Sequence, residues 1–169
     1  MPNEASDILS LAPSRAAAGR LSVSVTGPGE ARASALGVPV AAEGPVSPRL
    51  GLSRERLQAA GFDGSVGSAL ALAGTEGPLL VAFGTGPADR LDANARRGAA
   101  AALARVAAEH EALAIAVEET GDLPAQAAAQ ALVEGALLAR YAYGRLRREG
   151  SGKPVSALAL AWAGAPQAA

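Results

Sequence analysis

The second half of the chain alternates continuous apolar runs with stretches of helical periodicity. The predicted order is strand 79–83, helix 92–110, strand 113–117, a helix from Asp122 to about Arg148, and strand 156–162. Continuous apolar runs are typical of strands buried on both faces, and strand–helix–strand order implies right-handed crossovers. We therefore predict the α/β class: a three-layer α/β/α sandwich around a mainly parallel mixed sheet.

Two further strands are expected earlier in the chain. Residues 21–25 alternate apolar and polar side chains, which predicts a half-buried strand. Residues 36–42 form a second apolar run, interrupted by Pro39. Proline has no amide hydrogen for the ladder, so this run is expected at the edge of the sheet or to place Pro39 at a strand end.

A short helix and a glycine-rich stretch lie between these strands and the second half. Ser53 is a good N-cap, and Gly61 is placed to end the helix in a left-handed conformation. Phe62 is then expected in the core. Residues 64–74 mix glycine, serine and small apolar side chains, which indicates a strand or hairpin with close backbones.

The domain boundaries follow from these elements. We expect a loose lead-in over 1–20, one domain over 21–163 and a linker over 164–169. The first residues are acidic rather than basic, unlike a signal peptide, and no apolar stretch is long enough to span a bilayer. The expectation is a cytoplasmic protein with no membrane partner.

Composition removes several classes of function. The formal net charge of −1 lacks the positive footprint of a dedicated nucleic-acid binder, and the chain has no cysteine for disulfides or thiolate zinc sites. Neither an H-E-x-x-H nor a G-x-S-x-G motif occurs. The sequence therefore nominates no catalytic residue, no metal ligand and no cofactor site.

The stretch Gly84-Thr85-Gly86-Pro87 follows a buried strand and precedes a helix. Backbone amides at such a position can cradle phosphate. The full G-x-G-x-x-G spacing is missing, and the proline removes one donor. A tight structural connection is the favoured interpretation, with phosphate binding as the alternative.

The remaining polar candidates also have structural interpretations. His110, the single histidine, sits near the end of its predicted helix and is expected to be structural. Glu118 and Glu119 follow a strand end, but adjacent side chains on a strand point in opposite directions, so a paired acid and base is not expected. Asp122 is expected to cap the next helix.

Basic residues gather toward the end of that helix. The favoured interpretation is a solvated helix end, because cations there complement the helix dipole. Contact with DNA phosphates is the alternative and ranks last, given the near-neutral charge. The residues are Arg140, Arg145, Arg147 and Arg148.

The segment 133–145 resembles the end of the N-terminal domain in the leucyl aminopeptidase family, peptidase M17. In that family a helix reads Glu-Gly, then small and leucine residues, then Tyr-x-Phe and a basic tail, and Tyr143 here replaces the phenylalanine. Weaker similarities occur in the same order over roughly residues 20–163. The family-motif residues are Phe62, Gly64, Gly84, Gly86, Glu134, Gly135, Tyr141 and Tyr143.

The resemblance implies a macro-domain-like fold joined to a C-terminal catalytic domain in a homo-hexameric aminopeptidase with two divalent metals, zinc or manganese. The metal-binding lysine, aspartates and glutamate of that family have no counterpart in these residues. The leading hypothesis is a non-catalytic module that packs against the catalytic domain and neighbouring subunits. The alternative is a stand-alone module that binds ADP-ribose or another nucleotide.

Overall fold

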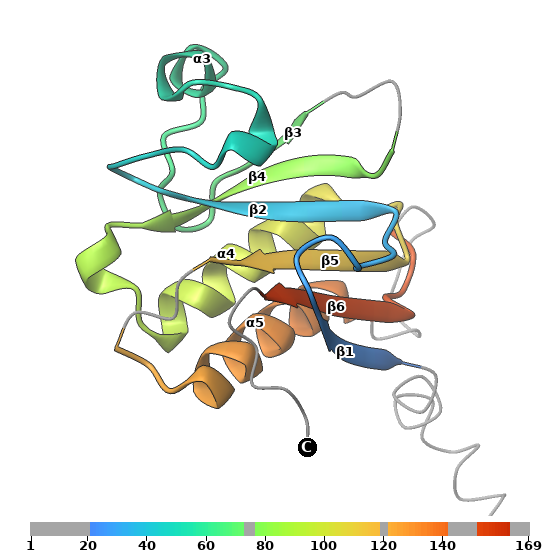
Figure 1. Ribbon diagram of the computed structural model, residues 1–169. Helices are drawn as coiled ribbons and strands as arrows, with labels where there is room; N and C mark the ends of the chain where they lie inside the picture. The colour runs from blue at the N-terminus through green and yellow to red at the C-terminus, as the bar shows by residue number, and fades with distance from the viewer. Residues whose placement is uncertain (1–20, 73–76, 119–121, 142–151, 163–169) are drawn as a thin grey trace, which may run out of the picture.

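The computed structural model describes residues 21–72, 77–118, 122–141 and 152–162 (Figure 1). Its strands are β1 Ser22–Thr26, β2 Ala35–Ala41, β3 Ala69–Leu72, β4 Leu79–Gly86, β5 Ala112–Val117 and β6 Ala157–Trp162. Its helices are α3 Arg54–Ala59, α4 Ala93–Val106 and α5 Ala125–Arg140, with 3-10 turns η1 Pro48–Leu50 and η2 Ala88–Arg90.

The six strands of the described residues form one sheet in the order β1-β6-β5-β2-β4-β3 (Figure 1). All neighbouring pairs are parallel except β3, which runs antiparallel to β4. The predicted α/β class and mainly parallel mixed sheet are therefore confirmed. The expected strand or hairpin over 64–74 is β3.

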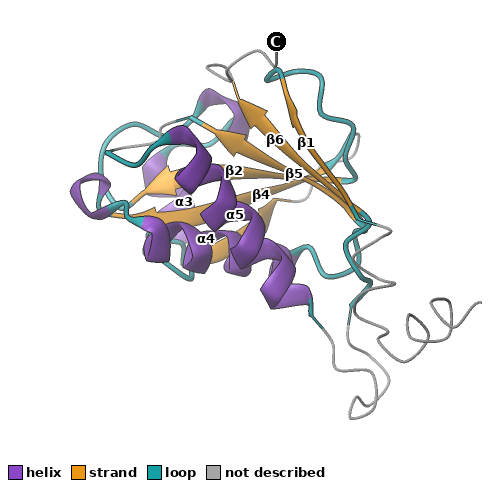
Figure 2. Ribbon diagram, turned by 90° about the horizontal axis from the view of Figure 1, so that it is seen from below, coloured by secondary structure: helices purple, strands orange, loops and turns teal. Residues whose placement is uncertain are grey.

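Helices α4 and α5 lie side by side over one face of the sheet (Figure 2). They bury the larger core cluster, in which Leu103 and Leu132 meet the strand residues Phe83, Ile115 and Leu160. The helix pair packs closely because its facing positions are small. A Cβ on Gly135 would lie 2.2 Å from the carbonyl oxygen of Arg97. The backbones of α5 and α4 therefore come into direct contact at Gly135.

The opposite face of the sheet is covered by shorter segments. Leu50 of η1, Leu57 of α3 and Phe62 pack on Val38 and Val40 of β2 in a second cluster. The Ser53 hydroxyl accepts a hydrogen bond from the Arg56 amide, and Gly61 takes a left-handed conformation with φ +82°. The predicted cap, helix end and core position are thus confirmed, and the sheet lies between two covering layers.

Strand β1 is the exception to this coverage. Val23 and Val25 lie in register with Leu158 and Leu160 of β6, so they occupy the sheet face that α4 and α5 cover further inward. Yet Val23 is 48% and Val25 51% exposed. The helix layer stops short of this edge.

The prediction of an edge position for the strand with Pro39 is wrong. Strand β2 is central, between β5 and β4. However, its pairing with β5 ends at Gly37, whereas pairing with β4 continues past Pro39. The proline is tolerated because β2 has a neighbour on one side only at that point.

The start of α5 also differs from the prediction. Its N-cap is Pro124, with no capping side chain, so Asp122 does not cap the helix. The fixed backbone of proline fits a helix entry without help from a carboxylate. Helix α5 ends at Arg140; the expected continuation to about Arg148 falls mostly on residues 142–151, outside the described part of the chain.

The predicted lead-in over 1–20 and linker over 164–169 also fall outside the described residues. Within the described ranges, none of the helices has the length and apolar character required to cross a membrane.

Candidate functional site

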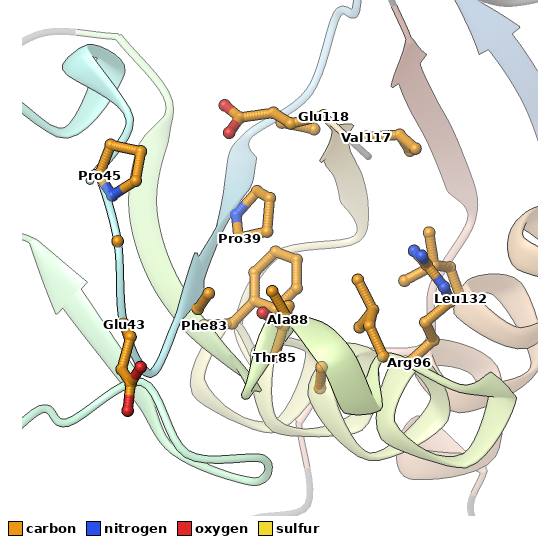
Figure 3. Close-up of a pocket in the computed structure, with 15 residues that line it drawn as sticks. Pro39, Glu43, Pro45, Phe83, Thr85, Ala88, Arg96, Val117, Glu118 and Leu132 are labelled. Atoms are coloured by element: carbon orange, nitrogen blue, oxygen red, sulfur yellow. The ribbon is translucent and has the colours of Figure 1, made fainter. Parts of the chain in front are cut away.

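A pocket opens at the carboxyl ends of the central strands β2, β4 and β5 (Figure 3). From β2 the chain leads toward β3 and β4 on one side, whereas from β5 it leads through α5 to β6 on the other. In parallel sheets such a reversal leaves a crevice in which ligands bind. Here β2 and β5 are no longer paired beyond Gly37, which opens the space between them.

The pocket has a volume of about 250 Å³ and a mainly apolar wall. Phe83 of β4 stands at its centre, with Pro39 on one side and Val117 and Leu132 toward the other (Figure 3). Phe83, Val117 and Leu132 belong to the larger core cluster, and the pocket lies where that cluster reaches the edge of the sheet.

Three charged side chains line the same pocket. Arg96, in the first turns of α4, is buried with 4% exposure, whereas Glu43 and Glu118 are exposed at the opening. Arg96 and Glu43 lie toward opposite ends of the pocket in Figure 3. The site is thus positive in its interior and negative at its rim.

Hydrogen bonds from two side chains, Arg54 and Ser47, hold the rim in place. The guanidinium of Arg54 donates to the carbonyl oxygens of Ala41, Ala42 and Gly44 over 2.9–3.1 Å, which fixes the segment after β2. The Ser47 hydroxyl donates to Oε1 of Glu118 at 2.7 Å, joining that segment to the end of β5. The pocket opening is therefore held by hydrogen bonds between segments that are distant in the sequence.

The glycines at 84 and 86 do not form a phosphate cradle. The strand continues through Gly86, where the Gly84 amide donates to Ser68 O and the Gly86 amide to Gly64 O, both at 2.9 Å. A Cβ on Gly84 would lie 2.0 Å from the carbonyl oxygen of Ser65. These glycines allow close backbone packing, so the structural interpretation is the one that the geometry supports.

The family-motif residues Glu134 and Gly135 serve the contact between α4 and α5. Oε2 of Glu134 accepts from Nε of Arg97 at 2.7 Å, and Oε1 accepts from Nε2 of Gln130 at 2.7 Å. The hydrogen bond from Gln130 first, and then that from Arg97, lower the pKa of Glu134 below its ordinary value.

The other motif residues are dispersed over the fold. Phe62 is buried beneath α3, Gly64 accepts from the Gly86 amide, and Tyr141 is 57% exposed just after α5. Tyr143 lies outside the described residues. None of the described motif residues lines the pocket.

Arg140 is a structural residue and not part of a solvated helix end. Its guanidinium donates to the carbonyl oxygens of Ala104, Ala107, Ala108 and His110, and also to that of Lys153. It therefore closes the carboxyl end of α4, whose last carbonyls have no partner within the helix. Burial lowers the pKa of the guanidinium, and Arg145, Arg147 and Arg148 lie outside the described residues.

Other sequence candidates do not gather at one place. His110 contributes its backbone, accepting from Arg140, while Glu118 is the candidate that reaches the pocket; Glu119 is not described. Among the described residues, no three His, Cys, Asp or Glu side chains are close enough together to hold a metal ion.

Sequence reasoning missed Arg96 as a pocket residue. Its signal was periodic: positions 96, 99, 100 and 103 follow the spacing of one buried helix face, and all four are buried. A buried arginine on that face indicates an internal polar site.

Two of three comparisons with known proteins found matches, and both agree with this architecture. The family model for the N-terminal domain of the cytosol aminopeptidase family matches residues 50–150. No curated protein sequence matches the chain.

Solved structures of known enzymes share this fold. A mutant of tomato leucine aminopeptidase is 16% identical with a TM-score of 0.64, covering 87% of this chain and 34% of its own. The bottromycin maturation enzyme BotP is 25% identical with a TM-score of 0.61, covering 77% of this chain and 27% of its own. BotP in complex with Mn is 24% identical with a TM-score of 0.60, over the same shares.

The chain thus spans about a third or less of the length of these enzymes. The low identities of the tomato enzyme and of the Mn complex support the fold alone, whereas the family model covers more than half of the sequence. On that match, this chain belongs to the cytosol aminopeptidase family and carries its N-terminal domain.

Proposed function

We propose that this domain is a non-catalytic packing and assembly module of a metal-dependent leucyl aminopeptidase, an enzyme that removes N-terminal amino acids from peptides. The observation that carries the proposal is strand β1. It is an edge strand whose Val23 and Val25 are about half exposed on the face covered elsewhere by α5. Uncovered edge strands invite pairing or burial by another chain or domain.

The proposal places the chemistry outside the described residues of this domain. Two divalent metals are implied by the family resemblance, but the donor set here does not fit them, because no group of three candidate ligands comes together in the described ranges. The proposal therefore assigns metal binding and peptide cleavage to a C-terminal catalytic domain, in a cytoplasmic homo-hexamer.

A nucleotide-binding module is less well supported. The amides of Gly84 and Gly86, which would have to hold phosphate, donate to backbone carbonyls. The pocket is also smaller than the roughly 300–1,000 Å³ that drug-sized ligands occupy.

Two experiments test the proposal. Incubating this chain with leucine p-nitroanilide and Mn²⁺ or Zn²⁺ should give no turnover above that of buffer. Metal-dependent cleavage that persists through further purification would show that the domain itself is catalytic.

The assembly role is tested in the full-length enzyme. Replacing Val23 and Val25 together by serine should shift analytical-ultracentrifugation profiles toward smaller species. Val106→Ser is the matched control, because Val106 is also exposed, at 39%, but lies at the end of α4. An unchanged oligomer with the double variant would contradict a role for β1 in assembly.

A further inference from the structure

We infer that the pocket between β2, β4 and β5 binds a small α-amino acid with an aliphatic side chain. This pocket is distinct from the exposed β1 edge on which the assembly proposal depends. The two proposals can therefore fail separately. If the pocket binds no amino acid, the assembly role of β1 still stands, and if β1 variants leave the oligomer unchanged, the pocket proposal still stands.

Size is the first argument for this ligand class. The pocket measures about 250 Å³, below the range of about 300–1,000 Å³ for sites that enclose drug-sized ligands. A nucleotide with two phosphates and a sugar needs more room and more donors than the pocket offers. A free amino acid is small enough to be enclosed.

The charge distribution is the second argument. Arg96 lies in the interior, in the first turns of α4, where the positive end of the helix dipole also favours an anion. Arg96 already takes part in another interaction, but a guanidinium carries several N–H donors and serves more than one acceptor. Glu43 and Glu118 lie at the opening and favour a cation. A zwitterion matches both ends at once.

The apolar wall selects the side chain. Phe83, Val117 and Leu132 line the space near Arg96, with Leu91 and Ala99 of the adjoining turn and helix. An aliphatic group gains free energy by leaving water against such a surface, at about 25 cal/mol per Å². Glycine, which has no side chain, should bind more weakly for this reason.

Glu118 is held ready for the ammonium group. Its Oε1 accepts from the Ser47 hydroxyl, which anchors one carboxylate oxygen and orients the group at the end of β5. Arg54 fixes the facing segment that carries Glu43. The rim is therefore organised before any ligand arrives.

The ligand class has a consequence that does rest on the proposed function. A leucyl aminopeptidase releases aliphatic amino acids, so under the proposed function this pocket would bind a product of the enzyme. The binding experiment below is done on this chain alone, so its result is independent of any peptidase activity.

Calorimetric titration with five ligands, ADP-ribose among them, tests the inference without altering the buried Arg96. Leucine should bind, whereas leucinamide, which lacks the carboxylate, and 4-methylpentanoate, which lacks the amine, should each bind at least roughly fivefold more weakly, the equivalent of about 1 kcal/mol. Glycine should also be weaker. No heat with millimolar leucine, equal binding of either half-ligand, or tighter binding of ADP-ribose would each overturn the inference.

Two variants, each with a matched control, then locate the site. Ala88 lines the pocket from the exposed turn η2, so Ala88→Leu should fill the opening and abolish binding, while Arg90→Leu adds the same side chain to that turn away from the pocket. Glu118→Gln should weaken leucine binding by up to roughly fivefold, the range of an exposed ion pair. Glu111→Gln makes the same charge change at an exposed site outside the pocket and should have no effect. Binding that tolerates Ala88→Leu would place the ligand elsewhere.

Discussion

Strands β1 and β6 lie side by side, yet apolar side chains on the same face are exposed on β1 and buried on β6. Val25 and Leu160 are partners in register, and their side chains share one face of the sheet. Leu160 is 1% exposed and Val25 is 51% exposed. An apolar position therefore becomes part of the core only where a second layer covers it, and the layer of α4 and α5 ends at β6.

Truncating the side chains of both partners tests this difference in burial most directly. Leu160→Ala should lower the free energy of unfolding by about 3 kcal/mol, through lost burial and the cavity left behind. Val25→Ala should cost about 0.5 kcal/mol or less, because half of the side chain is already in water. Urea unfolding followed by circular dichroism measures both, and equal losses would mean that β1 is covered in solution.

The covering layer can be weakened from its end instead. Arg140 ties the end of α5 to the last carbonyls of α4 and to Lys153, shortly before β6. Arg140→Met should lower the free energy of unfolding by about 2 kcal/mol, because the charged hydrogen bonds to the part-buried carbonyls at the end of α4 are lost.

Arg105→Met is the matched control for this change. Arg105 is in the last turn of α4 and exposed, so its replacement should cost less than about 0.5 kcal/mol. Thermal unfolding of both variants distinguishes the two roles. If Arg140→Met destabilised the domain no more than Arg105→Met, Arg140 would be a solvated residue at a helix end.

The smallest effect is expected at the outer surface of the helix pair. Hydrogen bonds from Gln130 and Arg97 lower the pKa of Glu134 from its ordinary value of 4.5 in the folded state. A carboxyl with a lowered pKa stabilises the fold above its unfolded pKa, and this contribution is lost as pH falls through the lower folded pKa.

Glu134→Gln should therefore destabilise slightly at pH 7 and less at pH 3, because the advantage of the wild-type carboxylate shrinks as the pH falls toward its lowered folded pKa. Unfolding midpoints measured at both pH values test this sign. A variant whose deficit grew toward acid pH would contradict the assigned cause of the shift.

Local signals were sufficient for much of the fold. The apolar runs of β4, β5 and β6, the Ser53 cap and the Gly61 helix end each depend on neighbours within a few residues. Central placement of β2 was not predictable in this way, because the proline rule concerns one amide, whereas strand order depends on contacts with β5 and β4.

The candidate site was less accessible from sequence. Glu118 was singled out at a strand end, but Arg96 and Glu43 join it only because α4 and the segment after β2 converge on the same edge. Conversely, Gly84 and Gly86 carried the spacing of a possible anion site, yet their amides are used by the neighbouring segment 64–68.

The α/β class, the parallel arrangement of the later strands and the family resemblance could all be inferred from periodicity and local motifs. Which apolar residues are covered, which amides and guanidinium groups are engaged, and where a pocket remains depend on how the elements pack. The physical reason is that burial and hydrogen bonding are properties of pairs of surfaces, and residues such as Val25 and Leu160 differ in what lies over them, not in what they are.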